Sequence, residues 1–224
     1  MHFVSTLIAA FAATTALAAP LGPILPPSNP SANASPQYCR TWQACLTAIN
    51  AARSSQEGLP AIALPSNWWD LTYAQRVWAF INLERVSRNL QPLATMINTY
   101  DSQVQTAVTN DADPIAPYGV GSWGSIWAGG EGMFPLSAIY LWMYVDGPGG
   151  NNLDCTASKT DGCWGHRDII LGADFNAIDS CAGKDSSGAD SFAALLLSPT
   201  TAPAAANTVM TWDAQKAFSA QGTY

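Results

Sequence analysis

The side chains able to do acid–base chemistry are few. Of the two histidines only His166 lies beyond the first nineteen residues, and the three glutamates are Glu57, Glu84 and Glu131. One histidine without a paired C-x-x-C motif does not predict a zinc site, and no G-x-S-x-G motif of serine hydrolases occurs. The chemistry left to the chain is general acid–base catalysis by carboxylates with one imidazole.

Glu84 lies on the face of a predicted helix that should be buried. The helix is expected over residues 70–88, where Glu84 shares the apolar face with Val77 and Ile81. A carboxyl group held among apolar side chains loses hydration, which favours the protonated form that can donate a proton. The alternative is a structural buried acid, bonded to backbone or paired with an arginine of the same helix. Those arginines are Arg76, Arg85 and Arg88.

Cleavage of a glycosidic bond needs a second carboxylate in a wetter place, to activate water or to stabilise positive charge. Glu131, in a glycine-rich segment, and Asp146, at a predicted helix end, are the candidates. We expect His166 to bond one of these two acids and so to tune it, or to orient a substrate hydroxyl. A purely structural histidine is the alternative.

Aromatic side chains near these groups are suited to stack on the apolar faces of sugar rings. The expected substrate-binding residues are Trp123, Trp127, Trp164 and Tyr144. Core packing is the alternative, above all for Trp142. The pair Trp68-Trp69 is interpreted as a staple at a helix entry.

The elements that must position these residues are a mixture of helices and strands. Helices are predicted over residues 38–55, 70–88, 93–110 and 136–145. Residues 173–181 and 190–198 are predicted to form a strand hairpin, residues 118–132 a glycine-rich loop or short strands, residues 166–171 a strand or a helix, and residues 209–220 an amphipathic segment.

The N-terminal region has the composition of a secreted precursor. Residues 1–19 are interpreted as a signal peptide. Residues 20–37, dense in Pro, Ser and Asn, are expected to form a linker or propeptide. They carry an N-glycosylation sequon at Asn33, so we expect a secreted, extracellular protein.

The five cysteines and the charge narrow the class of protein further. Spacing suggests disulfides between Cys39 and Cys45 and between Cys155 and Cys163, with Cys181 left over. A net charge of −7 without a basic cluster argues against nucleic acid and anionic membranes as partners. No apolar run after the signal peptide is long enough to cross a membrane.

Two stretches of the chain resemble the CAP superfamily of cysteine-rich secretory, antigen 5 and plant pathogenesis-related 1 proteins. Residues 81–85 (INLER) and 89–93 (NLQPL) are similar to the N-x-x-R helix and G-x-P-P-L exit of bacterial members. Residues 141–144 (LWMY), Asp146, a cysteine-bearing loop and residues 163–167 (CWGHR) are similar to the helix ending in W-x-x-E, the loop and the C-G-H signature. The resemblance implies one α+β domain over residues 38–224, an α-β-α sandwich with an open cleft.

Together these features predict a secreted glycan hydrolase that acts on bacterial cell-wall peptidoglycan, as a muramidase does. Glu84 would be the proton donor, and Glu131 or Asp146 the base or charge stabiliser. The CAP resemblance equally implies a non-catalytic protein that binds a sterol, a fatty acid or another apolar ligand. An effector recognised through a partner surface is a further hypothesis. We expect a monomer and no cofactor or metal.

Overall fold

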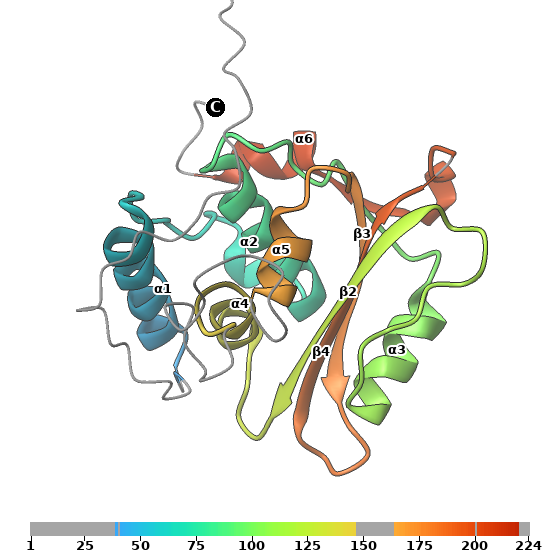
Figure 1. Cartoon of the computed structure of the whole chain (residues 1–224), viewed down its shortest axis with the longest axis horizontal. Coiled ribbons are helices and arrows are strands. Elements are labelled where there is room, and N and C mark those ends of the chain that lie inside the picture. Colours follow the sequence, from blue (N-terminus) through green and yellow to red (C-terminus); the bar gives the residue numbers. More distant parts are fainter. Residues whose placement is uncertain (1–38, 40, 147–163, 200, 220–224) are drawn as a thin grey trace, which may run out of the picture.

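Helices cover both faces of a mixed sheet (Figure 1). The computed structural model describes residues 39, 41–146, 164–199 and 201–219. Its helices are α1 Trp42–Glu57, α2 Tyr73–Val86, α3 Asp101–Asn110, α4 Pro135–Tyr144, α5 Gly165–Leu171 and α6 Trp212–Gln215, with short 3-10 turns η1 Trp68–Asp70, η3 Ala205–Asn207 and η4 Lys216–Phe218. Its strands are β1 Thr95–Ile97, β2 Ser122–Gly130, β3 Ala177–Lys184, β4 Asp190–Ser198 and β5 Thr208–Thr211. The expected α+β class is confirmed.

The five strands lie in the order β2-β4-β3-β1-β5, so β2 forms one edge of the sheet. β1 pairs with β3 in parallel, and the other three pairs are antiparallel. β3 and β4 form the predicted hairpin, although the first strand lies at Ala177–Lys184 and not at residues 173–181. The long edge strand β2 pairs along its whole length with β4, which places its glycine-rich backbone at the open side of the sheet.

Adjacent residues of β3 contact helices on opposite faces of the sheet, as the alternation of a strand requires. The hydroxyl of Ser180 donates to the carbonyl of Ala74 on α2, 3.2 Å away. The thiol of Cys181 donates to Oε1 of Gln105 on α3, at 3.1 Å. α3 therefore covers one face while α2, α4 and α5 cover the other, which gives three layers, α-β-α (Figure 1).

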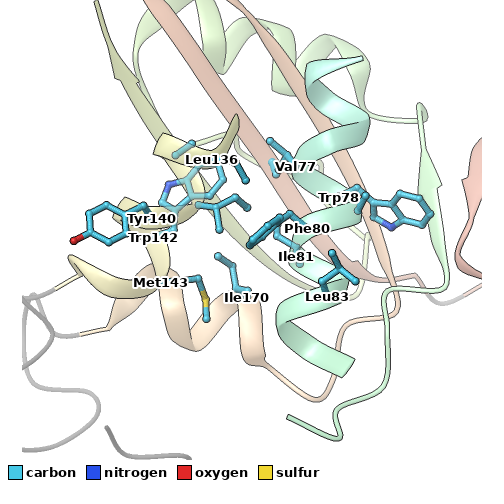
Figure 2. Packing of buried hydrophobic residues seen from close by; sticks show 14 of the residues in the cluster. Val77, Trp78, Phe80, Ile81, Leu83, Leu136, Tyr140, Trp142, Met143 and Ile170 are labelled. Carbon is cyan, nitrogen blue, oxygen red and sulfur yellow. The ribbon is translucent and has the colours of Figure 1, made fainter. Parts of the chain in front are cut away.

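The main core lies between the sheet and the layer of α2, α4 and α5 (Figure 2). Trp78, Phe80 and Ile81 of α2 are fully buried, as are Ile139 of α4 and Ile170 of α5. α2 begins at a capping box in which Thr72 and Gln75 exchange hydrogen bonds. The predicted helix is confirmed, but from Val77 to Val86 it is buried on every side and not only on the expected face.

One predicted helix is divided in the structure, and two segments that the prediction left open receive an assignment. The helix expected over residues 93–110 is divided into β1 and α3, because Met96 and Ile97 pair with the sheet. Residues 118–132 contain the nine-residue strand β2, and residues 166–171 lie in helix α5. Local composition had left both segments open; β2 pairs with β4 in the sheet, and α5 packs against β2 and α4.

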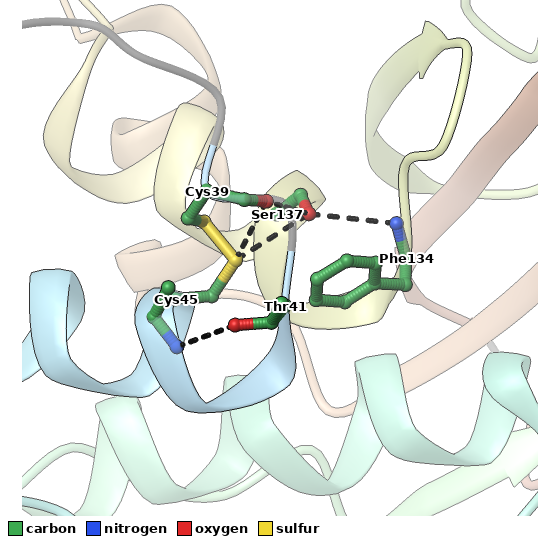
Figure 3. The surroundings of a disulfide bond; sticks show 6 residues. Cys39, Thr41, Cys45, Phe134 and Ser137 are labelled. Carbon is green, nitrogen blue, oxygen red and sulfur yellow. Dashed lines mark hydrogen bonds between the residues drawn. A yellow bond between two sulfur atoms is a disulfide. The ribbon is translucent and has the colours of Figure 1, made fainter.

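The predicted disulfide between Cys39 and Cys45 is present, with its Cα atoms 4.9 Å apart (Figure 3). It lies at the start of α1, where the amide of Cys45 donates to the carbonyl of Thr41 at 2.9 Å. Ser137 of α4 donates its hydroxyl to the carbonyl of Cys39 at 3.2 Å. Cys181 is a free, half-buried thiol. The predicted pair of Cys155 and Cys163 lies outside the described residues.

Candidate functional site

Glu84 lies at the centre of a buried ionic cluster and not in an open cleft. Its side chain has no solvent exposure, and it accepts hydrogen bonds from Arg53 of α1 and from Arg88, which is 2.5 Å away. The hydroxyl of Tyr144 also donates to it, at 2.9 Å. A carboxylate paired with two guanidinium groups and closed off from water cannot protonate a glycosidic oxygen, so the expected proton-donor role is wrong.

Glu57 extends the same cluster. Arg88 binds its carboxylate through two hydrogen bonds of 2.6 and 3.0 Å, and Nη2 of Arg167 donates to it at 2.7 Å. Burial alone would raise the pKa of Glu57, but Arg88 and Arg167 hold it below its ordinary value. Burial opposes the charge of Arg88, yet neighbouring Tyr144, Glu84 and Glu57 raise its pKa well above the ordinary value.

The cluster joins elements that are far apart in the sequence. Its charged members are Arg53 and Glu57 of α1, Glu84 of α2, Arg88, which follows α2, and Arg167 of α5. Tyr144, expected to bind substrate, is buried against it, and its pKa is raised by burial and by the charge of Glu84. A buried cluster in which each carboxylate meets two guanidinium groups has a structural role, as the alternative interpretation of Glu84 allowed.

His166 and Asp146 do lie together, at the surface. Nδ1 of His166 is 2.9 Å from Oδ1 of Asp146, and Oδ2 of Asp146 accepts the backbone amide of Arg167 at 3.0 Å. The carboxylate therefore holds the proton on Nδ1 and leaves Nε2 for a ligand. Trp164, two residues before His166, has a left-handed conformation (φ 54°) at the start of α5. Such a conformation is costly for a residue with a side chain, and here it occurs at the N-cap of the helix that carries His166.

The charge on His166 is stabilised by two acids. Burial lowers the pKa of His166, but the hydrogen bond and charge of Asp146, together with the charge of Asp113, raise it above the ordinary value. Burial raises the pKa of Asp113, and the charge of His166 opposes that shift. The site thus places the imidazole between one bonded carboxylate and a second acid within electrostatic reach, and both acids favour its protonated form.

A cavity of about 200 Å³ lies beside His166. Trp127 and Gly129 of β2, Leu141 and Trp142 of α4, and Asp146 line it. Trp142 donates its indole N–H to the carbonyl of Trp127 at 2.9 Å, and Trp127 donates to Ser191 at 3.0 Å. Trp127 is half-buried beside this cavity, as the expectation of an aromatic wall requires.

The other expected site residues lie elsewhere. Trp164 is buried, with 4% of its surface exposed, and Trp123 lies exposed near the start of β2, away from the residues that line the cavity. Glu131 is exposed in the turn after β2 and does not line the cavity either. Of the four acid–base candidates the structure therefore joins only Asp146 and His166.

Sequence reasoning missed Arg53, Glu57 and Asp113. The signal for the first two was present, because Ile49, Arg53 and Glu57 recur every four residues along one face of α1. Glu84 of α2 has the same pattern, a charge on an otherwise apolar helix face. Asp113 had no such signal, since only the loop between α3 and β2 brings it near His166.

A second cavity of about 760 Å³ lies between the loop that follows α2 and the C-terminal helices. Leu90, Pro92 and Trp212 supply apolar surface, and Asp213 and Lys216 supply charge. Over the described ranges no three His, Cys, Asp or Glu side chains are grouped as metal ligands would be. No helix there has the length and apolar character to cross a membrane.

Comparisons with known proteins give little beyond this geometry. No protein family and no curated protein matches the chain. Among solved structures, an outer surface protein from Borrelia burgdorferi is similar over 56% of this chain and 92% of its own, at 13% identity and a TM-score of 0.39. A likeness at that level supports no argument about function.

Proposed function

We propose that this protein is secreted and binds a polysaccharide, and that the cavity beside His166 holds one of its sugar residues. The observation that carries the proposal is the fixed pair of His166 and Asp146 at a cavity with aromatic walls. A protonated imidazole is a hydrogen-bond donor for sugar hydroxyls, and flat indole rings suit the apolar faces of sugars. Secretion is supported by the Cys39–Cys45 disulfide, because such bonds persist in oxidising compartments.

The size of the cavity favours a sugar over an apolar ligand at this place. Pockets that hold drug-sized apolar molecules measure roughly 300–1,000 Å³, whereas this cavity measures about 200 Å³ and contains charged groups. A sterol or fatty acid would need the larger cavity beside Trp212. The CAP resemblance stays a prediction, compatible with the α-β-α layers and with either ligand.

A binding assay tests the proposal directly. The full-length protein is incubated with insoluble peptidoglycan, and the bound fraction is measured beside His166→Gln and Glu131→Gln. We expect His166→Gln to lose most of the binding, and the exposed control Glu131→Gln to bind as the parent does. Equal retention of all three proteins, or no retention of the parent on this or other polysaccharides, would contradict the proposal.

Hydrolysis of the bound polysaccharide is the second candidate. The observation in its favour is Asp113, an exposed acid with a raised pKa within electrostatic reach of His166. Clearing of a cell-wall suspension by the parent but not by Asp113→Asn would assign a proton-transfer role to Asp113. Binding without clearing across the range from acidic to mildly alkaline pH leaves the protein a binding protein.

A further inference from the structure

An exposed group of aromatic rings lies where α1, η1, α2 and α4 begin. Trp42, Trp69 and Tyr73 keep 41%, 58% and 46% of their surface in solvent. With Trp68, Arg76 and Phe134 they surround a hollow of about 320 Å³. We call these six residues the aromatic cradle. Exposed aromatic side chains gathered around one hollow mark a binding site more often than scattered ones do.

The rings of the aromatic cradle are held in place before any ligand arrives. The guanidinium carbon of Arg76 lies 5.2 to 5.6 Å from the ring centroids of Trp68, Trp69 and Tyr73. Arg76 also donates to the carbonyls of Trp68 and Trp69, at 2.9 and 3.1 Å. Trp42 meets Trp69 edge to face with centroids 5.2 Å apart. Rigid rings lose little entropy on binding, which favours affinity.

The disulfide anchors the part of the aromatic cradle that holds Trp42 and Phe134. It joins Cys39 to Cys45 at the start of α1, the helix that Trp42 begins, and Ser137 of α4, near Phe134, donates to the carbonyl of Cys39 (Figure 3). Phe134 and Trp42 thus belong to two elements that are joined at their starts. The hollow keeps its shape because Arg76 holds the rings of Trp68, Trp69 and Tyr73, while the disulfide and Ser137 anchor the segments of Trp42 and Phe134.

The charge and the exposure of the rings indicate the kind of ligand. Along the described ranges no carboxylate forms an ion pair with Arg76, and its hydrogen bonds there go to backbone carbonyls. The chain has a net charge of −7, so this positive group at the hollow contrasts with the charge of the whole protein. Because the rings are about half exposed, a ligand here keeps one face in water, as a sugar ring does and a sterol does not.

We propose that the aromatic cradle binds an acidic sugar residue, whose apolar face lies on Trp69 and whose carboxylate pairs with Arg76. The proposal rests on the proposed function, because it specifies the class of polysaccharide and a second point of contact. Carboxylate and guanidinium form strong charge-assisted hydrogen bonds, and indole stacking supplies contact area on the neutral face of the ring.

Calorimetric titration of the full-length protein with an oligogalacturonate and with a neutral cello-oligosaccharide of equal length tests this. We expect the parent to bind the acidic oligomer about tenfold more tightly than the neutral one. Arg76→Gln should abolish that preference and Arg76→Lys should keep part of it. Trp69→Ala and Trp42→Ala should weaken binding of both oligomers.

Trp123→Ala is the matched control, because Trp123 is 41% exposed, as Trp42 is, and lies outside the aromatic cradle. Equal affinities for Trp69→Ala, Trp42→Ala and Trp123→Ala, or a parent that binds neither oligomer, overturn the proposal for the cradle. Retention on insoluble polysaccharide that depends on His166 would then still support the proposed function. If the parent is not retained on insoluble polysaccharide, the proposed function fails, whatever the result for the aromatic cradle.

Discussion

Two carboxylates of this protein, Glu84 and Asp146, have different roles, structural for the first and at the proposed site for the second. The groups that surround each carboxylate decide its role. Glu84 is enclosed by two arginines and a tyrosine, whereas Asp146 meets one imidazole at the surface. The sequence pattern located both acids but could not show Arg53, which reaches Glu84 from another helix. Burial of an acid is readable from periodicity, while its compensating charge depends on tertiary packing.

Glu84→Gln should therefore destabilise the fold. An amide cannot balance the charge of Arg53, which would remain buried without its carboxylate, while Arg88 would keep only Glu57. Breaking such a buried pair costs about 3–5 kcal/mol. Urea unfolding followed by tryptophan fluorescence measures the change. The exposed control Glu131→Gln should stay within about 0.5 kcal/mol of the parent. Equal stability of the two variants would show that the cluster does not hold the helices together.

Asp179 should make the stability depend on pH. Its side chain is buried on β3, and burial, with the charge of Asp101, raises its pKa to about 7, although the amide of Tyr100 donates to it at 2.6 Å. The folded state thus binds this proton more tightly than the unfolded chain. The contribution is fully present below about pH 4, and it is lost as the pH rises through about 7.

Asp179→Asn removes this titration and keeps an acceptor for Tyr100. Between about pH 4 and pH 8 the free energy of unfolding should fall about 2–4 kcal/mol more for the parent than for the variant. Urea unfolding at both pH values measures the difference, with the exposed Asp213→Asn as control. Parallel pH profiles for parent and Asp179→Asn would be evidence against a proton held by Asp179.

At the scale of elements, the edge strand β2 and helix α5 contribute to the cavity beside His166. Their secondary structure was the hardest to predict from the sequence. Gly124 of β2 lies against α5, where an added Cβ would come within 2.8 Å of Cγ2 of Ile169. Arg85 holds the end of α5 by donating to the carbonyls of Ile170 and Gly172, at 2.6 and 2.9 Å. Amphipathic α2 and the β3–β4 hairpin followed from periodicity, but these long-range contacts left no local pattern.

Gly124→Ala should push α5 away from the sheet and so move His166. Overpacking of this kind costs about 1–3 kcal/mol, and retention on polysaccharide should fall as well. Gly183→Ala is a matched control in strand β3, where the nearest atom to an added Cβ is 3.4 Å away. Thermal unfolding and the peptidoglycan assay measure both effects. If Gly124→Ala behaves as Gly183→Ala does, close packing of α5 on β2 is not required.

At the scale of the whole molecule, α1 is fastened to the rest of the fold at both ends. Near the C-terminus of α1, Arg53 and Glu57 belong to the ionic cluster. At its N-terminus, α1 is held by the Cys39–Cys45 disulfide and by the hydrogen bond from Ser137 to Cys39. Spacing predicted the helix and the disulfide, but not that α1 docks on α2 and α4. That docking brings Arg53 and Glu57 into the ionic cluster and Trp42 into the aromatic cradle.

Removal of the disulfide by Cys39→Ala with Cys45→Ala should therefore have two effects. Loss of a short closed loop costs about 2 kcal/mol, and the freed start of α1 should loosen Trp42 and weaken binding at the aromatic cradle. Thermal unfolding and oligogalacturonate titration measure the two effects separately. Cys181→Ala, which removes a half-buried free thiol, is the control. If the double variant keeps the melting temperature and the affinity of the parent, the ionic cluster alone holds α1 in place. The aromatic cradle would then not depend on the disulfide.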